Sequence, residues 1–218
     1  VVQLDQVTRW AEFSPDGRWL IARSRRGAGV WDARTGQPIT LAIQPTTPLH
    51  AIAFSRDGSR MAVCRKASGE TAGQPETRVY DAQTSRPITP PLPDVGEVAA
   101  LEFSPDGHWL VTVESDPNAD DLKGAAGYAA TVRIWDTATG RAASWLPRVE
   151  GHPVLWPRPP NDFFPKTVFS QDSARLTLLM TDGTALVWDI ATGRALDPVR
   201  LPDQRAVPKA FSRDGKRL

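Results

Sequence analysis

The stretch FSPDG occurs at Phe13–Gly17 and is repeated letter for letter at Phe103–Gly107. Near copies stand at 54–58 (FSRDG), 169–173 (FSQDS) and 211–215 (FSRDG). A second phrase follows four of the five copies: VWDARTG at 30–36, VYDAQTS at 79–85, IWDTATG at 134–140 and VWDIATG at 187–193. Because the two phrases recur in one order, the chain is an array of one structural unit.

The spacing of the repeated phenylalanine predicts the fold class. Successive copies lie 41, 49, 66 and 42 residues apart, and a period of about 40–50 residues with four short strands is the signature of a propeller blade. The segments between the phrases alternate with period two and are rich in Val, Ile, Trp and Thr, which excludes helical solenoids. The sequence therefore predicts an all-β fold, a β-propeller built of four-stranded antiparallel blades, with four blades and part of a fifth.

The repeats also set the expected domain organisation, a single propeller over residues 1–218. We expect the blades at about 5–46, 47–94, 95–148 and 165–202, a partial blade at 203–218, and an insertion at 147–165. Asp-Gly in the first phrase and Thr-Gly in the second supply tight chain reversals. The phenylalanine ends the first strand of each blade and should point into the layer between blades. The chain is expected to begin and end inside repeats, as a fragment of a larger protein.

The overall composition excludes several classes of partner. Twenty-six basic and 25 acidic residues leave a formal net charge of +1, so no global field favours nucleic acid or a membrane. No apolar run approaches membrane-spanning length. Cys64 is the single cysteine, which precludes an intrachain disulfide and favours a reducing, cytoplasmic location. Its place at the end of an apolar strand predicts a buried structural thiol.

FSPDG-type turns followed by [VI]-[WY]-D-x-x-T-G resemble the WD-repeat β-propeller family over almost the whole chain. The resemblance implies a closed ring, most often of seven blades, that acts as a scaffold for protein partners. Tyr80 replaces the usual Trp, and Ser85 replaces the turn Gly. Gly-His ahead of a first strand occurs only at 151–152, too far before Phe169, so we do not expect the hydroxyl-mediated hydrogen-bond network to the Trp that the family often has. TolB-like propellers, the alternative family, share FSPDG turns but usually lack WDxxTG.

The copies of the repeat differ most at three long insertions, 66–76, 115–129 and 147–165. In an antiparallel meander the chain crosses the sheet with every strand, so these insertions share one end of the blades, opposite the short turns. Loops on a rigid scaffold are where binding is usually built. We therefore expect a protein or peptide partner to bind this face.

The candidate partner-binding residues come from two of these insertions. Aromatic side chains and Arg are enriched in interface hot spots, and the third insertion carries Trp156, Arg158, Phe163 and Phe164. The second insertion carries Lys123, Asp120, Asp121 and Tyr128. The structural alternative is that the aromatic side chains fold back over the blade tops and the Pro-rich segments are spacers.

Catalytic and metal-binding motifs are absent from the sequence or incomplete. The histidines His50, His108 and His152 lie in no nucleophile motif, and GxSxG is absent, so no catalytic residue is predicted. Asp116, Asn118 and Asp120 match the first half of a calcium loop, but Asp121 and Gly127 occupy the positions that need Gly and Glu. We expect a solvated acidic loop there, no metal, and, without a phosphate-binding motif, no cofactor.

Two functions follow as hypotheses. The first is a non-catalytic protein–protein interaction scaffold that binds through the face with the long loops. The second is the regulatory or sensory propeller portion of a larger signalling enzyme such as a protein kinase. An open array of blades also exposes apolar faces and strand edges, so such an array is expected either to be only marginally stable alone or to associate with itself to complete a ring.

Overall fold

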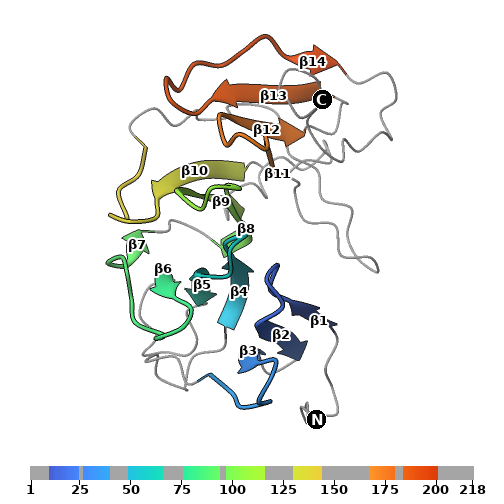
Figure 1. Ribbon diagram of the computed structural model, residues 1–218. Coiled ribbons are helices and arrows are strands. Elements are labelled where there is room, and N and C mark those ends of the chain that lie inside the picture. Colours follow the sequence, from blue (N-terminus) through green and yellow to red (C-terminus); the bar gives the residue numbers. More distant parts are fainter. Residues whose placement is uncertain are drawn as a thin grey trace, which may run out of the picture.

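The computed structural model describes residues 10–24, 27–39, 49–65, 76–93, 97–115, 130–143, 167–179 and 184–200. These residues form fourteen strands in four antiparallel sheets (Figure 1). The all-β fold class predicted from the repeats is confirmed.

Each sheet begins with the strand that leads into an FSPDG-type phrase. The first sheet holds β1 (Trp10–Phe13), β2 (Trp19–Ser24) and β3 (Gly27–Asp32). The second holds β4 (Leu49–Phe54), β5 (Arg60–Arg65), β6 (Glu76–Asp81) and β7 (Leu92–Pro93). The third holds β8 (Glu97–Phe103), β9 (Trp109–Ser115) and β10 (Ala130–Asp136). The fourth holds β11 (Thr167–Phe169), β12 (Arg175–Leu179), β13 (Thr184–Asp189) and β14 (Val199–Arg200).

Among the described residues two sheets have four strands and two have three. In the four-stranded sheets, isolated bridges Tyr80–Pro87 and Trp188–Ala195 join the second phrase to the segment that leads to β7 or β14. The three-stranded sheets have the corresponding bridges, Trp31–Pro38 and Trp135–Ala142. All four sheets therefore continue in the same way past the second phrase.

The FSPDG turn is held by its own Ser and Asp side chains. In the third sheet the Ser104 hydroxyl donates to Asp106 Oδ1 at 2.5 Å, and the Trp109 amide donates to Ser104 Oγ at 2.9 Å. The Gly107 amide closes the turn on the Ser104 carbonyl at 2.8 Å, with Gly107 at φ 72°. Because glycine adopts positive φ without steric cost, the predicted tight reversal forms as expected.

The second phrase makes a turn of another kind, in which one Asp caps the backbone. Asp136 Oδ1 accepts hydrogen bonds from the Thr139 amide at 2.7 Å and the Thr139 hydroxyl at 2.8 Å. The left-handed turn position is Gly in three of the four copies, whereas Ser85 occupies it in the second at φ 57°. Ser173, in the place of the FSPDG glycine, also takes positive φ, at 58°.

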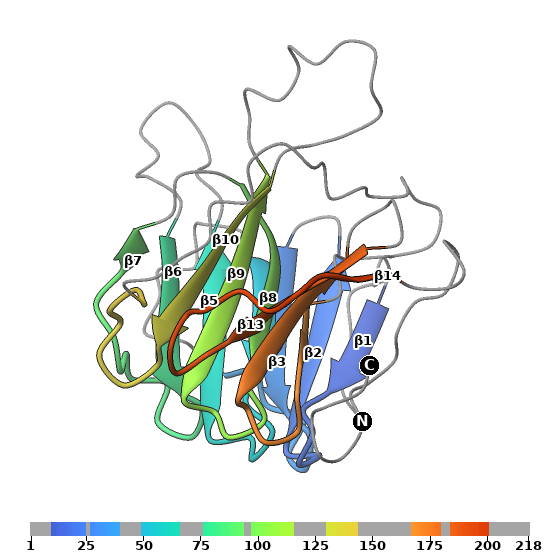
Figure 2. The same ribbon diagram turned by 90° about the horizontal axis from the view of Figure 1, so that it is seen from above.

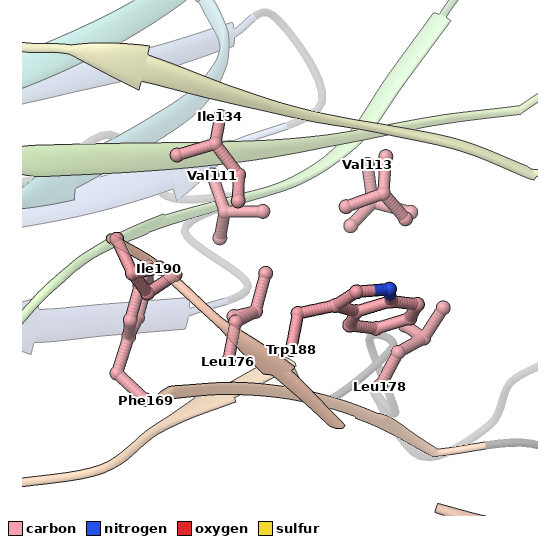
Figure 3. Close-up of a cluster of buried hydrophobic side chains, with 9 residues drawn as sticks. Val111, Val113, Ile134, Phe169, Leu176, Leu178, Trp188 and Ile190 are labelled. Carbon is pink, nitrogen blue, oxygen red and sulfur yellow. The ribbon is translucent and has the colours of Figure 1, made fainter. Parts of the chain in front are cut away.

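Apolar side chains fill the layers between consecutive sheets. Residues Ile21 and Val30 meet Met61, Val63 and Tyr80 between the first and second sheets, and Ala62, Val79 and Leu92 meet Phe103, Leu110 and Trp135 between the second and third. Figure 3 shows the third layer, where Val111, Val113 and Ile134 meet Phe169, Leu176, Leu178 and Trp188. We call the side of a sheet that meets the preceding sheet its leading face, and the opposite side its trailing face.

Candidate functional site

All eight candidate partner-binding residues lie outside the described residues. Asp120, Asp121, Lys123 and Tyr128 fall in the gap between β9 and β10, and Trp156, Arg158, Phe163 and Phe164 fall between β10 and β11. The calcium-loop candidates Asp116, Asn118 and Asp120 fall in the first of these gaps. Their roles stay predictions, and the described strands that flank the gaps define the candidate site.

The flanking strand ends lie together, at the end of the sheets opposite the FSPDG turns. Arg65 pairs with Glu76 across the gap in the second sheet, and Ser115 pairs with Ala130 across the gap in the third. Each pair stands at the far end of its strands from the turn that joins the first two strands of the sheet (Figure 2). We call this the loop-bearing end and the other the turn end.

A buried ion pair lies at the base of the 116–129 gap. Arg133 Nη1 lies 2.5 Å from Glu114 Oε1, and the Glu114 side chain is only 2% exposed, against 18% for Arg133. Glu114 is on β9 and Arg133 on β10, so the pair joins the two strands that enter and leave this gap. A charge-assisted bond in a desolvated place is strong but demands good geometry. The pair therefore holds the two strands in a fixed register where the insertion begins.

A second polar contact lies one step deeper on the same face. Trp135 Nε1 donates to Thr112 Oγ1 at 3.0 Å, and both side chains are buried. A hydroxyl contact to the strand Trp is thus present in the third sheet, although it is only one contact of the larger His- and Asp-containing network that the sequence did not lead us to expect. Thr112 faces Arg133 across the strand pair, so the hydrogen bond and the ion pair form a continuous polar strip on the leading face.

The second sheet has a related cluster at the same level. Arg78 Nε lies 2.5 Å from Glu76 Oε1, with both side chains about one third exposed. Burial raises the pKa of the nearby Tyr80 hydroxyl, against the opposing influence of the positive charges of Arg65 and Arg78. Tyr80 thus stays a neutral hydrogen-bonding group at ordinary pH, beside alternating charges at the loop-bearing end.

The sequence carried a signal for these residues that motif reasoning missed. In WLVTVES at 109–115, both alternating faces of β9 are buried, yet Thr112 and Glu114 are polar where Leu110 is apolar. A buried acid requires a partner, and Arg133 is the basic residue within the next strand. The long insertion between the two residues hid this pairing.

At the turn end, a cavity of about 280 Å³ opens where the first strands of the sheets converge. Residues from the strands of three sheets and from the turns that follow β1, β4 and β8 line it, among them Pro15, Phe54, Arg56, Phe103, Pro105 and Phe169. The lining is mostly aromatic, aliphatic and proline, with Arg56 and Glu102 as its charged members. The turn end is therefore hollowed in the part of the chain that the structure describes.

Other sequence predictions can be placed in the structure. Cys64 is buried, as expected for a structural thiol. His108 is exposed on the turn end, directly after a turn, whereas His152 lies outside the described residues. Within the described ranges no group of three or more His, Cys, Asp or Glu side chains is placed to hold a metal ion. Nor does any helix in those ranges have the length and apolarity needed to cross a membrane.

Comparison with known protein families identifies one repeat directly. Residues 93–136, which contain β8, β9 and β10, match the family described as WD domain, G-beta repeat. This match confirms the resemblance to WD-repeat proteins that the repeated phrases indicated, and the all-β structure is consistent with it. WD repeats generally mediate protein–protein interaction. No curated protein matched the chain.

Proposed function

We propose that this chain is a segment of a β-propeller and serves as a non-catalytic scaffold that binds a protein or peptide through its loop-bearing end. The four sheets are then successive four-stranded blades. Support comes from the regular stacking of the second, third and fourth sheets on the sheet before them and from the bridges that continue every sheet past its second phrase.

The observation that carries the choice of end is the polar strip at the base of the 116–129 gap. The ion pair between Glu114 and Arg133 joins the two strands that flank the gap. Deeper in the sheet, Thr112 accepts a hydrogen bond from Trp135. A rigid base favours binding by a loop, because the loop then loses less conformational entropy when it becomes ordered on binding. The neighbouring sheet adds the alternating charges of Arg65, Glu76 and Arg78.

The experiment compares variants at the two ends of the blades. One variant carries Trp156→Ala, and another carries Phe163→Ala with Phe164→Ala. The matched control carries Arg18→Ala with Arg141→Ala, two exposed residues at the turn end. Quantitative pull-down from cell extract identifies a partner, and binding is then measured with the purified partner. We expect the loop variants to weaken binding at least tenfold, as loss of about 1.4 kcal/mol requires.

Equal binding by the folded loop variants and the wild type, or selective loss in the turn-end control, would contradict the proposal. Far-ultraviolet circular dichroism establishes that each variant is folded. The alternative, a regulatory portion of a signalling enzyme such as a protein kinase, stays a prediction, and no feature of the described residues favours it.

A further inference from the structure

The cavity at the turn end is bounded by successive copies of the FSPDG-type phrase. The phenylalanine of the phrase lines it in the second, third and fourth sheets, at Phe54, Phe103 and Phe169. The third residue of the phrase lines it in the first, second and third copies, at Pro15, Arg56 and Pro105. Most of the lining belongs to the second and third sheets, each of which has another sheet packed on both of its faces. The cavity is therefore produced by the packing of neighbouring phrases.

The wall of the cavity suits an aromatic side chain. Phe54, Leu101 and Pro105 are only partly buried and Pro15 is exposed, so apolar surface there is in contact with solvent. Covering such surface is favourable, and aromatic rings pack well against one another edge to face. The volume of about 280 Å³ lies below the roughly 300–1,000 Å³ of most small-molecule pockets. It therefore favours a single side chain over a cofactor.

Arg56 brings an uncommitted positive charge to this cavity. Its side chain is exposed and, within the part of the chain that the structure describes, makes no ion pair or hydrogen bond. Glu102, the other charged residue of the lining, already has an interaction within the chain. A guanidinium can bind a carboxylate through two parallel hydrogen bonds. The ligand that complements this cavity therefore carries a carboxylate beside its apolar group.

The turn that contains Arg56 does not require an arginine. The other three described copies have uncharged residues at the same position: Pro15, Pro105 and Gln171. The turn is held instead by its Ser and Asp, since the Ser55 hydroxyl donates to Asp57 Oδ1 at 2.6 Å, as the corresponding residues do in the other sheets. The charge of Arg56 is thus available for recognition without any cost to the fold.

We propose that this cavity is a second binding site, which takes an aromatic side chain of a peptide while Arg56 pairs with a carboxylate beside that side chain. It lies at the opposite end of the sheets from the loop-bearing end, so the two ends bind separate partners. A nucleic acid is the less favoured occupant, because a single arginine cannot neutralise a row of phosphates and the net charge of the chain is only +1.

The test titrates the full chain with short peptides and follows its two-dimensional proton–nitrogen NMR spectrum, which locates even weak binding. The probe is acetyl-Gly-Phe-Glu-Gly-amide, and two matched peptides replace Glu with Gln or Phe with Ala. We expect saturable shifts at the backbone amides of the turns after β4 and β8. Loss of the aromatic ring should weaken binding at least about tenfold. Loss of the carboxylate should weaken it about threefold, as for an ion pair with an exposed arginine.

Two variants of the chain test the two parts of the site. Arg56→Gln introduces the residue of the fourth copy and should abolish the preference for the Phe-Glu peptide over the Phe-Gln peptide. Pro15→Trp adds a large ring to the wall, at a position where other copies have Arg or Gln, and should weaken binding of both peptides at least about tenfold. The matched control is Arg141→Gln, an exposed arginine of the turn end outside the cavity lining, which should bind like wild type.

Support for the site requires shifts at the cavity that Pro15→Trp removes, together with a preference for the Phe-Glu peptide that Arg56→Gln abolishes and Arg141→Gln keeps. The absence of saturable shifts up to about 10 mM peptide, equal binding of the three peptides, or binding that Pro15→Trp leaves unchanged overturns the proposal. Shifts confined to the loop-bearing end overturn it as well, and so does tighter binding of an oligothymidine than of the probe. The dispersion of each spectrum establishes that the variant is folded.

Discussion

The residues Phe13–Gly17 and Phe103–Gly107 are identical, but the two phenylalanines lie in opposite environments. Phe103 is 7% exposed and contacts the second sheet, whereas Phe13 is 60% exposed. Their turns are the same, since Ser14 and Ser104 make the same hydrogen bonds to Asp16 and Asp106. The comparison shows that the phrase determines the turn, while the neighbouring sheet determines whether its phenylalanine contributes to a core.

Replacing each phenylalanine with alanine tests this comparison and should have the largest effect on stability. Phe103→Ala removes a buried ring from the layer between two sheets and should lower the free energy of unfolding by about 3–5 kcal/mol. Phe13→Ala should change it by less than about 0.5 kcal/mol in dilute protein, because the ring is largely in water already. Urea denaturation measures both. Similar losses in the two variants would show that Phe13 is covered in solution.

The polar strip is the second difference between these two sheets. Glu114→Gln leaves Arg133 in a desolvated place without its counter-charge, which should cost about 2–3 kcal/mol in unfolding free energy. Glu12→Gln is the matched control, because Glu12 is exposed on β1, and it should stay within about 0.5 kcal/mol of wild type. Hydrogen exchange at β9 and β10 should also rise in Glu114→Gln. If both variants melt alike, the ion pair does not hold the base of the insertion.

The first and third sheets also show which features of the structure could be predicted from the sequence. The first strand of each sheet ends at the phenylalanine of its phrase, as expected, at Phe13, Phe54, Phe103 and Phe169, because the turn that follows fixes where the strand ends. The exposure of Phe13 was not predictable from its phrase, since it depends on which sheet lies beside it. Equal phrases therefore gave equal turns but unequal burial.

The candidate site was less predictable than the fold. Comparison of copies identified where insertions interrupt the repeat, but the insertion residues have no counterparts in sister repeats, so local rules do not place Trp156 or Phe163. The Glu114–Arg133 pair depends on a contact between residues on either side of the 116–129 insertion. Only the rule that a buried charge needs a partner points to it. That rule applies because both faces of β9 are buried, and the neighbouring sheets, not the strand's own residues, decide this burial.

Ser85 and Ser173 both adopt a positive φ. Comparing them separates the effect of backbone strain in a turn from the effect of a hydrogen bond between sheets. Ser85→Gly removes the steric cost of a positive φ and should stabilise the chain by about 0.5–1 kcal/mol. Ser173→Gly relieves the same strain, but Ser173 Oγ also accepts a hydrogen bond from the Asp106 amide of the preceding sheet at 3.1 Å. Loss of that bond, worth about 1 kcal/mol, should cancel the gain. Urea denaturation measures the unfolding free energy of both variants. An equal increase in both would show that the hydrogen bond between sheets does not contribute to stability.

The smallest expected effect concerns Asp57, the acidic residue of the turn phrase in the second sheet. The Ser55 hydroxyl donates to Asp57 Oδ1 at 2.6 Å, and this bond lowers the pKa of the Asp57 carboxyl below its ordinary value of 3.8, against the opposing effect of partial burial. The folded state then binds fewer protons than the unfolded state near that value. The stabilisation is therefore complete above pH 3.8 and is lost as the pH falls through the lowered folded pKa.

The advantage of wild type over Asp57→Asn in unfolding free energy should accordingly be constant from about pH 5 to 7 and shrink towards about pH 3. Because Asp57 is exposed, solvent screening keeps this advantage small. Urea denaturation at each pH measures it. An advantage that is unchanged at low pH would mean that the turn needs only the shape and hydrogen bonds of the side chain, and not its charge. In that case the shape and hydrogen bonds of the Asp side chain alone would explain why the first and third sheets have the same turn.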